Sequence, residues 1–96
     1  MSIETEPETP NPIEALRALS VCLRHLSCGW ALHPAERVAC LAILESGIPG
    51  ADGADLAAAT KILASSRRLP LRRRDQASQL SIRFAERAEA LRESDR

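Results

Sequence analysis

The fold is decided by a stretch near the start of the chain, residues 11–30, which read NPIEALRALSVCLRHLSCGW. Large apolar side chains recur there every three or four positions, at Leu16, Leu19, Leu23, Leu26 and Trp30. This spacing places them on one stripe of an α-helix, with the charged residues on the opposite side. Asn11 is a favourable N-cap and Pro12 suits the first helical position, so we expect a helix over residues 12–29.

A second helix is expected over residues 34–46, between Pro34 and Gly47. The segment is apolar nearly all round, and a buried strand is the competing interpretation. Its alanines, and the Pro-Ala-Glu-Arg that opens it, favour a helix. A helix that is apolar on every side is buried on several sides, so we expect this one to lie at the centre of the fold.

Two further helices follow the turn at residues 47–51. Asp52 is a good N-cap and predicts a helix over residues 52–66. Pro70 suits a helix start and predicts the longest helix, over residues 70–93. Together with the first two segments, they predict an all-α protein, a compact antiparallel bundle of four helices.

The composition supports this fold class. Aromatic residues make up 2% of the chain, which is rich in Ala, Leu, Arg and Glu, all good helix formers. We expect a single helical domain over residues 11–96. Residues 1–10 are acidic and carry two prolines, which predicts a disordered tail.

Charge is unevenly spread along a chain whose net charge is zero. Residues 65–83 hold six arginines and one acid, Asp75. Arginine neutralises phosphates and pairs with carboxylates, and glutamine adds hydrogen bonds, so we expect this part of the chain to bind a partner. The alternative is an ordinary solvated face. The candidate binding residues are Arg67, Arg68, Arg72, Arg73, Arg74, Gln76, Gln79 and Arg83.

The favoured function is that of a non-enzymatic interaction protein, such as a small regulator, adaptor or inhibitor. Its partner would be a protein with an acidic surface. The alternative is a DNA- or RNA-binding regulator, because the second and third helices with their glycine-containing turn form a unit of helix-turn-helix type. The third helix would then be the reading helix, although its expected exposed residues are a poor set for contacting bases: Asp55, Ala58, Lys61 and Ser65. Arginine-for-lysine usage is typical of bacterial or phage proteins.

Catalytic, metal and cofactor sites are not expected. The glycines fit no phosphate-binding loop. Cys22, His25 and Cys28 are spaced three apart, but Cys22 and Cys28 would lie about 9 Å apart along one helix, too far for one tetrahedral ion. We expect Cys22 and Cys40 to be buried free thiols.

Free thiols and an acidic start to the chain favour a cytoplasmic protein. The longest apolar run, residues 38–44, is far shorter than the roughly 20 residues that cross a bilayer, so no membrane partner is expected. Apolar side chains outside the main stripes could pair with a second copy in a homodimer, or could simply line the bundle. They are Ile13, Val21, Cys28, Leu71, Ile82 and Ala85.

Overall fold

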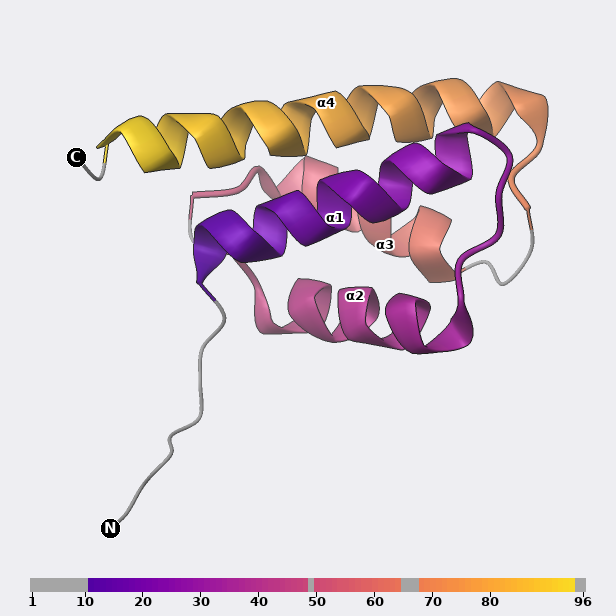
Figure 1. The fold of residues 1–96 in the computed structure, drawn as a ribbon, viewed down its shortest axis with the longest axis horizontal. Helices are drawn as coiled ribbons and strands as arrows, with labels where there is room; N and C mark the ends of the chain where they lie inside the picture. The colour runs from indigo at the N-terminus through magenta and orange to yellow at the C-terminus, as the bar shows by residue number, and fades with distance from the viewer. Residues whose placement is uncertain (1–10, 49, 65–67, 95–96) are drawn as a thin grey trace, which may run out of the picture.

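A computed structural model describes residues 11–48, 50–64 and 68–94. Across these residues the chain forms four helices, α1 (Pro12–Ser27), α2 (Pro34–Ser46), α3 (Gly53–Ala64) and α4 (Leu71–Ser94). Successive helices run in opposite directions, and α1 and α4 lie side by side along most of their length (Figure 1). The predicted all-α bundle of four helices is therefore confirmed. The predicted tail, residues 1–10, lies outside the described residues.

The start of α1 is capped as expected. The side chain of Asn11 accepts a hydrogen bond from the backbone nitrogen of Ile13 at 2.9 Å, and Pro12 occupies the first turn. This bond satisfies one of the amide groups that a helix start leaves without a partner.

The end of α1 differs from the prediction. The helix stops at Ser27, and Gly29 takes a φ of +87° in the turn that follows. Trp30 therefore lies beyond the helix, where the helical spacing no longer applies. Its side chain is 63% exposed and its ring lies 5.6 Å from that of His25. The prediction that Trp30 continues the buried stripe is wrong.

The next two helices also begin at side-chain caps. His33 precedes α2 and accepts a hydrogen bond from the nitrogen of Ala35 at 3.2 Å, while Glu36 accepts one from the nitrogen of His33 at 3.3 Å. The carboxylate of Asp52 accepts from the nitrogen of Ala54 at 2.9 Å at the start of α3. The cap of α2 is reciprocal and that of α3 is a single hydrogen bond, and both mark where the helix begins. Residues 65 and 66, predicted to end the third helix, lie outside the described residues.

The core is built mainly between α1 and α4, with α3 closing one side. Its largest fully buried side chains are Leu16, Leu19, Leu23, Ile62, Leu63 and Leu69. On α4 the buried positions alternate large and small, with Leu80 and Phe84 beside Ala77 and Ala88. Because alanine and serine add little bulk, the backbones of α1 and α4 can approach closely.

α2 is a peripheral helix, contrary to the prediction that it is central. Its buried residues are Cys40 and Leu44, whereas α1 has seven buried residues. Val38 is 62% exposed. The leucine stripe of α1 already fills the centre, so α2 contributes only a narrow stripe of Cys40 and Leu44, with Leu41 and Ile43 partly buried against the core. No helix in the described ranges is long and apolar enough to span a membrane.

Candidate binding surface

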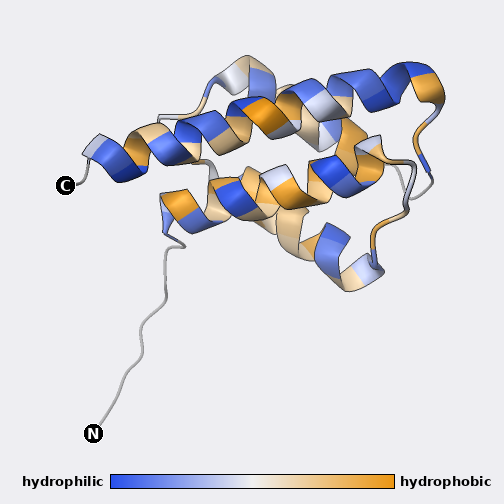
Figure 2. Ribbon diagram, turned by 45° about the horizontal axis from the view of Figure 1, so that its top comes forward, coloured by the Kyte–Doolittle hydropathy of each residue, from blue (hydrophilic) through white to orange (hydrophobic). Residues whose placement is uncertain are grey.

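The predicted binding residues that the structure describes extend from the segment before α4 to the middle of that helix. Six of them, from Arg72 to Arg83, lie on α4, and Arg68 lies in the exposed segment before it. Arg67 lies outside the described residues. The first turns of α4 form a strongly hydrophilic end of the molecule (Figure 2). The structure thus spreads these residues along the first half of α4 and the segment before it, where their side chains make different contacts.

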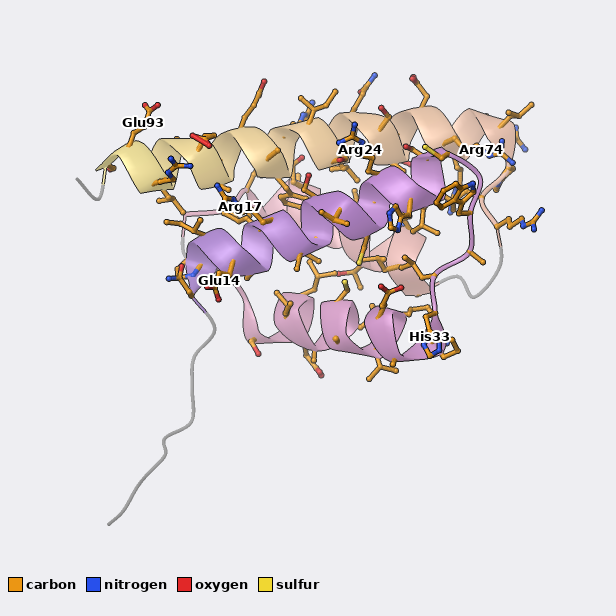
Figure 3. All side chains as sticks on the ribbon, viewed as in Figure 1. Glu14, Arg17, Arg24, His33, Arg74 and Glu93 are labelled. Carbon is orange, nitrogen blue, oxygen red and sulfur yellow. The ribbon has the colours of Figure 1, made fainter. Side chains whose placement is uncertain are left out.

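Arg74 is held inside the fold. Its Nε donates a hydrogen bond to the carbonyl of Leu69 at 2.9 Å, and its side chain is half-buried. Its guanidinium lies against Gly29, where an added Cβ would be 2.9 Å from the Arg74 Cζ atom. Figure 3 shows Arg74 at the end of the bundle where α1 finishes. Arg74 therefore joins the turn after α1 to the segment before α4.

Arg83 is paired with an acid of α3. Its Nη1 donates to Asp55 Oδ1 at 2.8 Å, and the Asp55 side chain is only 15% exposed. The Arg83 side chain remains 59% exposed. The ion pair ties α3 to the middle of α4, and it neutralises one charge of the predicted surface.

Arg73 and Gln76 line a groove between α3 and α4. Its other lining residues come from α3, and they are Ala57, Ala58, Lys61 and Ile62. We call this feature the basic groove. Its volume is about 300 Å³, and none of its lining residues is acidic. Among the described residues, neither Lys61 nor Arg73 forms an ion pair.

The shape of the basic groove follows from residue size. Ala57 and Ala58 precede Lys61 by about one turn of α3, so small side chains leave space beside a long basic one. Ile62 is buried and forms an apolar wall. The groove therefore combines positive charge with a small apolar surface.

Arg72 and Gln79 are exposed on α4. Gln79 lies near Asp75, with 3.5 Å between the Gln79 Nε2 and Asp75 Oδ2 atoms. Arg72, like Arg68, extends the positive surface beyond the basic groove. The role of Arg68, Arg72 and Gln79 in binding a partner stays a prediction.

Lys61 is a groove residue that the predicted set does not contain. In sequence it stands alone as the only lysine, on a helix with no other basic residue. Its position opposite Arg73 depends on how α3 packs against α4. The alanines at positions 57 and 58 are the one local signal, because they mark a helix face that leaves room beside the lysine.

The histidines and cysteines are dispersed or buried. His33 caps α2, His25 lies against Trp30, and Cys28 is exposed on its own. Cys22 and Cys40 contact each other, with 3.1 Å between their Sγ atoms. In the described ranges, no group of three or more His, Cys, Asp or Glu residues could hold a metal ion.

No family model, no curated protein and no solved structure matches the chain.

Proposed function

We propose that this protein is a non-enzymatic interaction protein that binds an acidic segment of a protein partner in the basic groove. The observation that carries the proposal is that Lys61 and Arg73 line one groove that contains no acid. In a chain of zero net charge, such a separation of charge provides a local attraction for carboxylates. Arg72 and Arg68 extend the attraction beyond the groove.

The apolar part of the groove favours a peptide as the ligand. Ala57, Ala58 and Ile62 offer a surface for a small aliphatic side chain between the two basic groups. The groove volume of about 300 Å³ lies at the low end for ligand sites, which suits one or two side chains of a peptide rather than a large cofactor. A segment that alternates carboxylates with small apolar residues would satisfy both features.

A second candidate is the binding of single-stranded nucleic acid, and the exposure of Trp30 favours it. Trp30 follows Gly29, against which the guanidinium of Arg74 packs. Bases stack on exposed aromatic rings, and nearby arginines neutralise phosphates. The helix-turn-helix version has less support, because four of the six exposed residues of α3 are glycine or alanine and offer no side-chain groups for reading bases.

The peptide proposal is tested with a fluorescein-labelled peptide of alternating glutamate and alanine, followed by fluorescence anisotropy. The double substitution Lys61→Ala, Arg73→Ala should weaken binding at least about tenfold, because each charged hydrogen bond contributes about 1.5–3 kcal/mol. The matched control Arg24→Ala, Arg92→Ala removes the same charge from exposed positions outside the groove and should change affinity less than about twofold.

Equal losses in the two double variants would contradict the proposal, because they would show attraction to net charge alone. A peptide of alternating lysine and alanine serves as the negative control.

Trp30, the only tryptophan, distinguishes binding of nucleic acid from binding of the acidic peptide. Binding of an oligothymidylate by stacking would quench the fluorescence of Trp30 and would be lost in Trp30→Ala, whereas the acidic peptide should leave that fluorescence unchanged.

A further inference from the structure

Two buried thiols meet between α1 and α2. Cys40 donates a hydrogen bond from its Sγ to the Sγ of Cys22 at 3.1 Å. Both side chains belong to the core, and both cysteines are free. The contact joins α1 to a helix whose only other buried residue is Leu44.

We propose that Cys22 and Cys40 form a redox-active dithiol that an oxidant converts into an intramolecular disulfide, which fastens α2 to α1. A disulfide has its sulfur atoms about 2.05 Å apart, so the two atoms need to approach by only about 1 Å. They come from neighbouring helices that already pack together.

Cys22 is the residue that reacts first. The hydrogen bond from Cys40 stabilises the Cys22 thiolate and lowers the pKa of Cys22, while it raises the pKa of Cys40, which must keep its proton to donate. Cys22 is also the more accessible of the two, with 8% of its surface exposed against 3% for Cys40. The thiolate is the nucleophilic form of cysteine, so electrostatics and access point to the same sulfur.

With hydrogen peroxide as the oxidant, the reaction has two steps. The Cys22 thiolate attacks one peroxide oxygen, the O–O bond breaks, and hydroxide leaves, which produces a sulfenic acid on Cys22. The Cys40 sulfur then attacks the Cys22 sulfur, the S–O bond breaks, and the hydroxyl group leaves with the Cys40 proton as water. The two sulfurs lose two electrons in total, and the peroxide gains them.

Cys28 provides an internal control. It is exposed at the C-cap of α1 and lies six residues after Cys22, about 9 Å further along the helix axis. Exposure alone would make Cys28 the first thiol to be oxidised. Formation of a bond between the two buried cysteines instead requires their contact in the folded protein.

The test is oxidation of the full chain with hydrogen peroxide, followed by alkylation, trypsin digestion and mass spectrometry without reduction. Cleavage after Arg17, Arg24, Arg37 and Lys61 separates the cysteines into three peptides. We expect a cross-linked pair of the peptides 18–24 and 38–61, with Cys28 in an alkylated peptide 25–37. Oxidation should also raise the melting temperature by roughly 10–20 °C, because Cys22 and Cys40 are 18 positions apart and the bond closes the loop between them.

The variant Cys28→Ser should form the cross-link at the same rate as the natural chain and show the same rise in melting temperature. The variants Cys22→Ser and Cys40→Ser should show neither. If one of these two unfolds, as seen by circular dichroism, Cys28→Ser and the natural chain still decide the question. Oxidation of Cys28 with the thiols of Cys22 and Cys40 intact, or a cross-link that leaves the melting temperature unchanged, would overturn the proposal.

Discussion

Ser20 and Ser81 exchange hydrogen bonds across the interface of α1 and α4. The hydroxyl of Ser20 donates to the carbonyl of Ser81, and the hydroxyl of Ser81 donates to the carbonyl of Ser20, each at 2.8 Å. Both side chains are buried. A serine at each position keeps the backbones close enough for a side chain of one helix to reach the backbone of the other.

We expect the serine pair to respond differently to loss of the hydroxyl and to added bulk. Ser81→Ala removes one hydrogen bond and should lower the free energy of unfolding by about 1 kcal/mol. Ser81→Val also forces the helices apart and should cost about 1–3 kcal/mol on top of that. Urea denaturation followed by circular dichroism measures both. Equal costs would show that the helices do not approach as closely as described.

The unequal burial of α1 and α2 predicts unequal effects of truncation. Leu23 is fully buried, and Leu23→Ala should lower the free energy of unfolding by about 2–5 kcal/mol, because it removes contacts and leaves a cavity. Val38→Ala, on the exposed side of α2, should change it by less than about 0.5 kcal/mol. Thermal and urea denaturation of the two variants provide the comparison. A large effect at Val38 would mean that α2 is central after all.

Gly29 should tolerate no side chain. Its φ of +87° costs an alanine roughly 1–2 kcal/mol, and the new Cβ would also displace the Arg74 guanidinium. Gly29→Ala should therefore destabilise the protein in the natural background. Because the backbone strain persists without the arginine, Gly29→Ala should remain destabilising in an Arg74→Ala background. Urea denaturation of the four chains of this cycle gives both effects, and a neutral Gly29→Ala in either background contradicts the described turn.

The Asp55–Arg83 ion pair should contribute modestly and depend on salt. Arg83 is more than half exposed, so solvent screens the pair, and we expect a coupling energy of about 0.5–1 kcal/mol. The measurement is a double-mutant cycle with Asp55→Asn and Arg83→Gln at low salt and at 1 M sodium chloride, where the coupling should fall by about half, because the Debye length of about 3 Å is then comparable with the 2.8 Å separation of the charged atoms. A coupling that is insensitive to salt would require a buried pair.

The helices could be predicted because their ends are marked locally. Local backbone geometry and hydrogen bonds fix these helix ends. The residues that do so are Asn11 and Pro12 for α1, Pro34 and Gly47 for α2, and Asp52 for α3. Such signals act within a few residues, so they can be seen in one sequence. The predicted boundaries of α2 agree with the structure at both ends.

The arrangement of the helices was harder to predict, because it depends on competition between them. The segment that became α2 is apolar on all sides, yet the leucines of α1 occupy the centre. Trp30 matched the helical spacing, but the turn at Gly29 ends the helix before that spacing reaches it. Assigning residues to helix faces by their spacing assumes that the helix continues. Which apolar face is buried is decided by how the helices pack.

In the candidate binding surface, too, local features could be predicted from the sequence and contacts between distant segments could not. The exposed arginines of α4 could be identified from composition, but the role of Arg74 depends on Gly29, which lies 45 positions earlier in the sequence. Lys61 enters the basic groove only because α3 packs antiparallel to α4 (Figure 1). Contacts between distant segments carry this information, and a single sequence does not display them.

The shallow attachment of α2 has a consequence for how the protein opens. Cys40 and Leu44 are the buried residues of α2, with Leu41 and Ile43 partly buried, so α2 should separate while the α1–α4 pair stays folded, as a subglobal opening event. Amide protons of α2 should then exchange with deuterium well before those of α1, at a rate that does not follow global unfolding. The region of the chain that most resembles a core element in its composition would thus be the first to meet solvent, proteases and chemical reagents.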